Sequence, residues 1–275
     1  MSRFTAPNVW DCQFHTKSSF FNPFIKSLEF IKNKSKWPEI NGLAQALSSK
    51  KIQTKSGKLL QPYNQDDISL LESPIDYENL IYDKGLILTR PQNWHDFFNA
   101  LIWLNFPATK GLLNEWHYEE NKVKKEQVRS ALQNTIAHFD ECGMIILSDR
   151  PELFELIKEH QWSKFFCENK NLVKKHIRCI VFGHSILERL LNPYIGLTSK
   201  SLCFKVNDDI MQSNIIDQVK YADNLCFDYL SKQKDHLISH KLQPFPMLGM
   251  TEIIEKDNFD YINNKNYFRE KPVKR

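Results

Sequence analysis

The chain has 275 residues, of which 41% are hydrophobic and 12% aromatic, a composition that excludes a wholly disordered protein. Its length allows one large domain or two small ones, either of which can bury a sizeable core. The formal net charge of +4 is small for this length. The basic cluster at residues 271–275 is predicted to be a frayed tail rather than a nucleic-acid-binding surface.

The six cysteines are scattered along the chain, with no C-x-x-C pair and no Cys/His spacing typical of zinc. This pattern predicts a reduced protein without a disulfide scaffold. No run approaches the roughly 18 apolar residues that would span a membrane, and the first residues lack the charged and apolar regions of a signal peptide. We therefore expect a soluble, cytoplasmic protein that has no membrane partner.

Hydrophobic periodicity predicts two helices in the N-terminal part of the chain, at residues 17–34 and 37–48. Residues 49–62 contain several lysines and a Ser-Gly-Lys sequence, which predict an exposed loop that ends in a short strand at 58–62. We expect residues 1–75 to form a helical and extended segment that packs on the core.

Residues 76–90 contain two apolar runs separated by the turn-forming residues 83–85. The pattern favours a β-hairpin, or alternatively a strand that leads directly into the next helix. That helix is predicted at about 94–105, with Asn93 as its N-cap and Asp96 three residues later in a capping-box relation.

Two further helices are predicted next, at about 107–121 and 126–141. Pro107 occupies a favourable first position for the earlier of the two. Gly143 is typical of the residue that follows a helix C-terminus. The apolar residues 144–147 then predict a short buried strand.

The remaining sequence alternates between strand and helix patterns. Asp149 is predicted to cap a helix that has Glu152 at its third position. The later elements are expected as a strand at 177–182, a helix at 184–191, a strand at 202–206 and a long helix at 209–232, followed by loops.

These elements predict an α+β fold, mainly helical with mixed α/β character. In it, helices pack on a small mixed sheet whose central strands lie near 144–147 and 177–182. We expect residues 76–250 to form the core domain and residues 251–275 to form a polar C-terminal tail.

The helix predicted at 94–105 carries a narrow polar arc on an otherwise apolar surface. At 100° per residue, His95, Asp96 and Asn99 lie within about 100° of one another. A helix that is apolar almost all round is buried, so this arc is predicted to face a cleft or an internal polar network. The helix N-terminus favours a neutral His95, which suits a general base or a metal ligand. The alternative is that Asp96 only caps the helix and His95 binds a backbone carbonyl.

On the next helix, Lys110, Asn114 and His117 fall within about 60° of one another. They are a cation, an amide and an imidazole on one face, which together suit an anionic ligand. A solvated helix face has the same pattern.

Asp140 and Glu141 lie in the last turn of the helix predicted at 126–141. Carboxylates there interact unfavourably with the helix dipole, at a cost of roughly 0.3–1 kcal/mol each. A positive group is expected to compensate them. The candidates are Arg129, a lysine or a bound metal. Arg129 in a structural ion pair with Asp140 is one explanation, and a metal or acid–base role is the other.

His184 and Ser185 lie where a strand passes into a helix, with Glu188 one turn later and able to orient His184. Open parallel sheets bind ligands at the carboxyl ends of their strands, so Ser148-Asp149 and His184-Ser185 could converge if their strands are neighbours. No G-x-S-x-G elbow, dinucleotide fingerprint, phosphate-binding loop or H-E-x-x-H sequence is present.

These residues occur within a set of short motifs that resembles a bacterial family of unknown function, domain-of-unknown-function family 3025. The resemblance covers roughly residues 75–270 and implies no established activity, cofactor or partner. It rests on Thr89-Arg90, Asn93-Trp94-His95-Asp96, Phe98-Asn99-Ala100-Leu101, Trp103, Phe106-Pro107, Lys110, Asn114, His117, His138-Phe139-Asp140-Glu141-Cys142-Gly143, Val181-Phe182-Gly183-His184, Leu187-Glu188, Pro193-Tyr194, Gly196-Leu197-Thr198, Pro244, Pro246, Leu248-Gly249 and Tyr267-Phe268-Arg269.

The preferred hypothesis is a hydrolase that acts on a phosphorylated or other anionic small molecule or nucleotide. In it, His95 is the base or a metal ligand, Asp140 and Glu141 provide acid–base groups or bind a divalent metal, and Lys110 or Arg129 holds the anion. Two alternatives remain open: a non-catalytic binding or scaffold protein with a buried polar network, and an RNA-associated factor. The sequence indicates neither the metal nor the oligomeric state.

The most specific expectation is that His95, Asn99, Asp140 and His184 line one common cleft, although they come from three separate segments. Each of these segments breaks a local preference, and such breaks tend to gather at functional sites.

Overall fold

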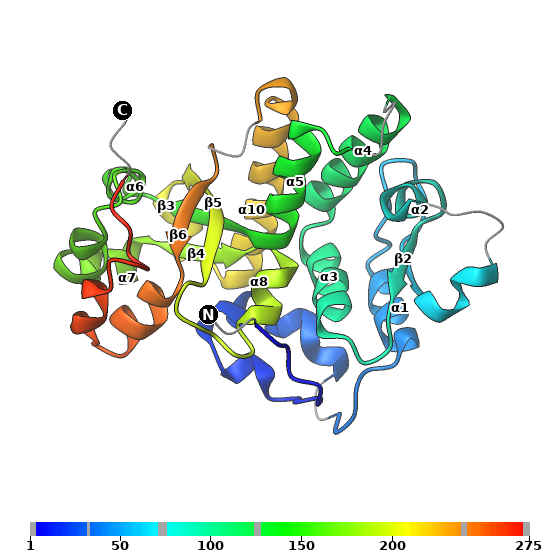
Figure 1. Cartoon of the computed structure of the whole chain (residues 1–275), viewed down its shortest axis with the longest axis horizontal. Coiled ribbons are helices and arrows are strands. Elements are labelled where there is room, and N and C mark those ends of the chain that lie inside the picture. The colour runs from blue at the N-terminus through cyan, green and yellow to red at the C-terminus, as the bar shows by residue number, and fades with distance from the viewer. Residues whose placement is uncertain (1–3, 32–33, 71–75, 124–127, 238–240, 272–275) are drawn as a thin grey trace.

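The protein folds as α+β, as predicted. The computed structural model describes residues 4–31, 34–70, 76–123, 128–237 and 241–271. In Figure 1 the main sheet lies to the left of α3 and α4, whereas α1, α2 and β2 lie to the right.

The described strands are β1 (Gln61–Asn64), β2 (Leu86–Thr89), β3 (Gly143–Ser148), β4 (Arg178–Val181), β5 (Thr198–Lys205) and β6 (Gln243–Pro246). The described α-helices are α1 (Ile40–Ser49), α2 (Tyr77–Lys84), α3 (Trp94–Asn105), α4 (Pro107–Val123), α5 (Ala131–Cys142), α6 (Glu152–Lys158), α7 (Lys170–His176), α8 (His184–Arg189), α9 (Asp208–Gln212) and α10 (Ile215–Ser231). Shorter 3₁₀ and π segments are Phe14–Thr16, Ser19–Ile31, Gln65–Leu70, Lys164–Glu168, Lys234–His236, Gly249–Glu255 and Phe259–Asn263. None of the described helices has the length and apolar character needed to cross a membrane.

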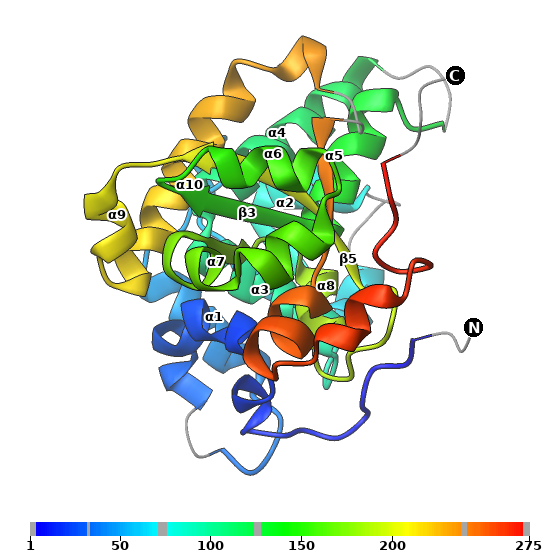
Figure 2. The same ribbon diagram turned by 90° about the vertical axis from the view of Figure 1, so that its left-hand side faces the viewer.

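The main sheet has four strands in the order β4-β3-β5-β6. Strand β3 runs antiparallel to β4 and parallel to β5, and β6 is antiparallel to β5. All six residues of β3 are buried, which explains its continuous apolar run. Seen from the side, α6 lies above β3 and α7 below it (Figure 2). The two strands expected at the centre are thus paired, with β3 inside the sheet and β4 at its edge.

An aromatic cluster joins the N-terminal segment to α3. The rings of Trp10 and Trp94 stack at a centroid distance of 4.8 Å, and Phe14 packs edge-on against Phe98 at 5.5 Å. All four rings are buried. Large aromatic side chains contribute most of the apolar area in such a contact, so this segment supports the helix that carries the polar arc.

The predicted hairpin between residues 76 and 90 is wrong, because its first half is the helix α2. The carboxylate of Asp76 accepts hydrogen bonds from the backbone N–H groups of Glu78 and Asn79, and Gly85 ends the helix at φ 74°. Two strong caps therefore outweigh the short apolar run within this segment. The alternative expectation holds for β2, which leads directly into α3.

Capping also explains three differences elsewhere in the chain. The helix expected from residue 126 begins at Ala131, where Ser130 and Gln133 form a capping box. The helix expected at 209–232 is divided in two because Asn214 caps α10. Asp149 does not cap α6; it pairs with His176 instead, at 2.9 Å.

Proline accounts for two of the remaining differences. Residues 19–31 are helical, as predicted, but they form 3₁₀ turns with Pro23 inside, where an α-helix would lose a hydrogen bond. The first strand is at 61–64 rather than 58–62, and two prolines lie in an edge strand, β6, rather than in a loop.

The last part of the described chain packs on the core rather than extending as a tail. Ile262, Tyr267 and Phe268 are buried, and the Tyr267 hydroxyl donates a hydrogen bond of 2.6 Å to the carbonyl of Leu197. Of the basic cluster expected to fray, residues 272–275 lie outside the described residues.

Candidate functional site

A polar pocket of about 620 Å³ lies among the helices α2, α3, α4, α5 and α8. Its wall combines acidic, basic and imidazole side chains from α2 to α5 and α8. The lining residues are Gln65, Asp76, Tyr77, Glu78, Leu88, Arg90, His95, Asp96, Asn99, His117, Asn121, Arg129, Gln133, Ala137, His138, Asp140, Glu141 and His184. The prediction that His95, Asn99, Asp140 and His184 share one cleft is therefore confirmed.

The first turn of α3 presents His95 to the pocket and Asp96 to its rim. Asn93 caps the helix, as predicted, by accepting a hydrogen bond from the backbone N–H of Asp96. The Asp96 carboxylate does not complete a capping box. It binds the Arg90 guanidinium at 2.8 and 2.9 Å and the Arg90 backbone N–H at 2.7 Å, a two-pronged contact that holds both side chains in place.

A close backbone approach at Gly183 places His184 beside α5. The Gly183 N–H donates to the carbonyl of Gly143 at 2.8 Å, and a Cβ atom at Gly183 would lie 2.4 Å from the carbonyl oxygen of Glu141. Only glycine fits at such a distance. His184 therefore begins α8 directly next to the acidic pair at the end of α5.

The expectation that Ser148 and Asp149 meet His184 is wrong. Strands β3 and β4 are antiparallel, with Met144 beside Val181. Ser148, at the other end of β3, is therefore remote from the end of β4 that leads into His184. Ser185 is buried beside His184 but does not line the pocket.

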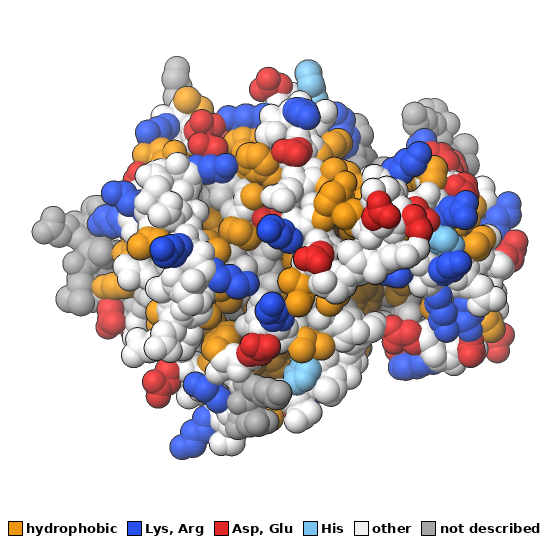
Figure 3. Space-filling model, turned by 180° about the vertical axis from the view of Figure 1, so that it is seen from behind, with side chains coloured by type: hydrophobic (Ala, Val, Ile, Leu, Met, Phe, Trp, Pro, Cys, Tyr) orange, Lys and Arg blue, Asp and Glu red, His pale blue; other side chains and the backbone are white. Residues whose placement is uncertain are grey.

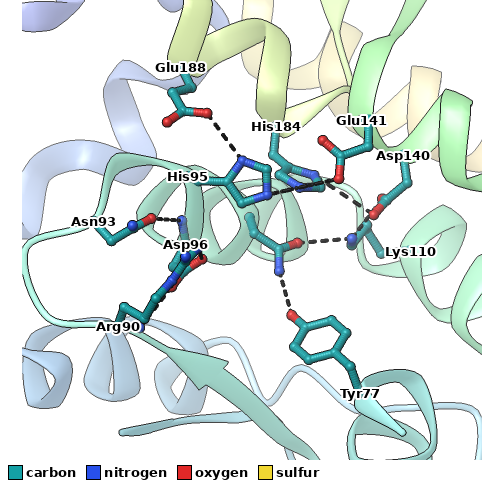
Figure 4. Close-up of polar contacts among 11 residues, drawn as sticks. Tyr77, Arg90, Asn93, His95, Asp96, Lys110, Asp140, Glu141, His184 and Glu188 are labelled. Atoms are coloured by element: carbon teal, nitrogen blue, oxygen red, sulfur yellow. Dashed lines mark hydrogen bonds and ion pairs between the residues drawn. The ribbon is translucent and has the colours of Figure 1, made fainter. Parts of the chain in front are cut away.

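Two imidazoles and one carboxylate converge on a single point of the pocket wall (Figure 4). The Nε2 atoms of His95 and His184 are 3.0 Å apart. The Oε1 atom of Glu141 is 3.5 Å from the His184 Nε2 and 3.9 Å from the His95 Nε2. These three side chains each offer one possible metal-binding atom, and the three atoms lie within 4.8 Å of one another. Among the described residues they form the group of His, Cys, Asp and Glu side chains that could hold a metal ion.

The outward-facing ring nitrogens of both histidines point to carboxylates. The Nδ1 of His95 is 3.1 Å from the Oε2 of Glu188, so Glu188 orients His95 and not His184, contrary to expectation. The Nδ1 of His184 is 3.7 Å from the Oδ2 of Asp140 and makes no hydrogen bond within the described residues. This arrangement directs both Nε2 atoms toward Glu141.

The three donor atoms fit a divalent transition metal. Zinc binds histidine nitrogen at about 2.0–2.1 Å and carboxylate oxygen at about 2.0–2.2 Å, so two donors of one ion lie up to about 4 Å apart. Two facing Nε2 atoms can form a hydrogen bond only if one of them carries a proton, whereas a metal uses both lone pairs. Carboxylates on the outer nitrogens are the usual partners of histidine ligands.

A row of buried polar side chains, linked by hydrogen bonds, lies next to this cluster. The Lys110 ammonium contacts the Oδ1 of Asp140 at 2.7 Å and the Oδ1 of Asn99 at 3.0 Å. The Asn99 amide donates to the Tyr77 hydroxyl at 2.8 Å. Asp140 therefore pairs with Lys110 rather than with Arg129, because Lys110 projects from α4 into the space between α3 and α5 while Arg129 lies at the exposed rim of the pocket.

The charges in this cluster shift its titrations. Burial by itself raises the pKa of Glu141, but the contact with His184 and the charges of His95 and Lys110 hold it at about 2. Burial lowers the pKa of His95, but the hydrogen bond to Glu188 and the neighbouring carboxylates outweigh burial and raise it above its ordinary value. The expectation that the helix N-terminus keeps His95 neutral is therefore wrong in direction.

The second predicted set of site residues, on α4, is not available to a ligand as a unit. Lys110 is held by Asp140, and Asn114 donates its amide to the side chain and the backbone carbonyl of Glu78 at 2.7 and 2.9 Å. His117 lines the pocket with only 8% of its surface exposed. Arg129 lines it at the rim. Of the three residues on α4, only His117 lines the pocket, together with Arg129 from the segment before α5.

Sequence reasoning missed Tyr77 and Glu78, which both line the pocket. They were assigned to a hairpin, where neither would belong to a site. The signal that could have located them is Asp76, which has the residue type and position of an N-cap and places the two side chains in the first turn of α2.

The acid stability of the fold should depend on His117. Burial lowers its pKa from 6.5 to about 4, so on acidification the unfolded chain takes up a proton at this residue well before the folded chain does. Stability therefore falls between about pH 6.5 and pH 4. This titration changes the free energy of unfolding by about 1.4 kcal/mol per pH unit. When the pH falls from 7 to 4.5, His117→Gln should therefore lose about 2–3 kcal/mol less of its free energy of unfolding than the wild type. Urea unfolding at a series of pH values measures this difference. The stability of the control variant His138→Gln, at an exposed histidine, should depend on pH as that of the wild type does. If all three proteins show the same dependence of stability on pH, His117 does not cause the loss at acidic pH.

A family model described as a protein of unknown function (DUF3025) matches residues 63–272, which confirms the family resemblance noted in the sequence. No curated protein and no solved structure matches the chain.

Proposed function

Because the chain belongs to the DUF3025 family, whose description assigns no activity, we propose a function from the pocket itself: a metal-dependent hydrolase that acts on a small molecule with an anionic group. The observation that carries this proposal is the convergence of His95, Glu141 and His184 in the wall of a pocket large enough for such a molecule.

A metal bound by two histidines and one carboxylate keeps open positions for water and substrate. Such an ion lowers the pKa of its bound water to near neutrality and so supplies a nucleophile. Glu188 contacts the outer nitrogen of His95 at 3.1 Å, and the Asp140 carboxylate lies 3.7 Å from the outer nitrogen of His184. Pockets of a few hundred Å³ with a few convergent polar groups are typical of small-molecule sites.

The charges in the pocket favour an anionic group on the substrate. Asp96 is paired with Arg90, and Asp140 with Lys110, so these four charges offset one another. A divalent ion would offset the charges of Glu141 and Glu188 and would offer its open positions to an anionic oxygen. Arg129 adds a further positive charge at the rim, and its planar guanidinium suits a carboxylate or phosphate.

A non-catalytic scaffold is the second candidate, and the buried chain from Tyr77 through Asn99 and Lys110 to Asp140 favours it. Such a chain by itself stabilises a fold. The adjoining pocket is the feature that a scaffold does not need. For an RNA-associated factor, a continuous basic stripe would be expected; on the face in Figure 3, Lys and Arg side chains alternate with Asp and Glu.

The proposal is tested by metal analysis of the purified protein together with a screen of phosphoester, carboxylic ester and amide substrates under added Zn²⁺, Mn²⁺ or Mg²⁺. We expect one bound metal per chain and turnover that a chelator removes. His95→Ala should abolish turnover with a nearly unchanged thermal midpoint. If the histidine instead belongs to a purely structural network, the same change should cost roughly 1–3 kcal/mol of stability, and no metal should be found.

A further inference from the structure

Glu78 is an acidic side chain of the pocket that the metal cluster does not use. It lies in the first turn of α2 and lines the pocket. Its Oε2 accepts a hydrogen bond of 2.7 Å from the Asn114 amide, which also binds the Glu78 backbone carbonyl at 2.9 Å. The residue is therefore held at two points by one neutral side chain.

No cation neutralises Glu78 within the described part of the chain. The nearby ammonium of Lys110 is taken by Asp140 and Asn99, at 2.7 and 3.0 Å. The charged groups that act on Glu78 are Asp76 on its own side of the pocket, Lys110 from α4 and Asp140 from α5. Two of these three are carboxylates, which disfavour a further negative charge.

These surroundings stabilise the protonated form of the Glu78 carboxyl. Burial raises its pKa most, the charges of Asp140 and Asp76 raise it further, and Lys110 and the Asn114 amide only partly oppose them, so that it reaches about 7. A neutral amide partner also allows the proton to leave or return without breaking an ion pair.

One oxygen atom at this end of the pocket is buried without a partner. The Asn114 Oδ1, on the side chain that binds Glu78, makes no hydrogen bond to any described residue. Buried polar atoms without partners are rare and call for an explanation. A substrate group that carries a donor, or the carboxyl proton of Glu78, would satisfy it.

We infer that Glu78 is the general acid of the proposed hydrolase and donates its carboxyl proton to the leaving-group oxygen. In this step the oxygen of a water molecule bonds to the phosphorus or acyl carbon of the substrate, and the bond from that atom to the leaving oxygen breaks. The leaving oxygen takes the proton from Glu78, and the proton released by the water restores the acid. The inference rests on the proposed function and adds the residue that serves the leaving group.

The dependence of rate on the leaving group tests this role. Glu78→Gln should slow hydrolysis of an alkyl phosphate by about 10²–10⁴-fold, the range for loss of a general acid. It should slow p-nitrophenyl phosphate far less, because nitrophenolate leaves without a proton. If the screen identifies a carboxylic ester or amide substrate instead, the same comparison uses its alkyl and p-nitrophenyl forms. Glu120→Gln on α4, outside the pocket lining, is the matched control and should leave both rates unchanged.

Two further measurements separate this inference from the proposed function. Glu78→Gln should keep the metal content of the wild type, since Glu78 is not one of the three donors. In the ¹³C spectrum of the carboxyl groups, one signal should titrate near pH 7 and disappear in Glu78→Gln. Equal rate losses on both substrates, or a Glu78 midpoint near 4.5, overturn the general-acid role while the metal site stands. A wild type without metal or turnover overturns both.

Discussion

The wild-type protein titrated with Zn²⁺ should bind one ion per chain, and His184→Ala should weaken that binding by more than about 100-fold, because even the loss of an outer partner of a ligand costs roughly 10–100-fold. His184 supplies a donor atom from a side chain that is only 5% exposed. Its position is set by the backbone contact of Gly183 and does not depend on the ion. Isothermal titration calorimetry measures the affinity directly.

Two variants make this prediction specific to the assigned geometry. Glu188→Gln, which changes only the partner of the His95 Nδ1, should weaken zinc binding by about 10–100-fold. His138→Ala removes an exposed imidazole from the same pocket and should leave the affinity as it is. If all three variants bind zinc like the wild type, the ion is held elsewhere and the proposed metal site is wrong.

Lys110→Met should destabilise the fold by about 3–5 kcal/mol, the usual cost of removing one partner of a buried ion pair. Only 7% of the Lys110 side chain and 18% of the Asp140 side chain are exposed. The substitution leaves a carboxylate and the Asn99 amide oxygen without their shared cation. Urea unfolding followed by circular dichroism measures the loss.

A surface pair and a double variant control for this effect. Lys158 and Glu155 form an exposed pair, with 56% and 64% of their side chains accessible, so Lys158→Met should change stability by less than about 1 kcal/mol. Lys110→Met combined with Asp140→Leu removes both charges and should recover part of the lost stability. A Lys110→Met protein as stable as the wild type would show that this pair contributes little.

Much of the site could be located from the sequence, because the relevant signals were local. The cap at Asn93 and the start at Pro107 identified α3 and α4, and the polar arc on an apolar helix pointed to His95 and Asn99. The acidic pair at the end of α5 indicated that a positive group had to lie nearby. It did not indicate which one, because the compensating lysine lies 30 residues earlier in the chain.

Short-range rules therefore sufficed for the fold class, most of the elements and the segments that build the pocket, since capping and periodicity act over a few residues. Which side chains contact one another could be determined only from the tertiary structure. Glu188 meets His95 rather than His184. Strands β3 and β4 run antiparallel, and Asp149 pairs with His176 instead of lining the pocket. Such pairings depend on the direction of strands and the relative rotation of helices, which are set by burial summed over the whole core and not by any one segment.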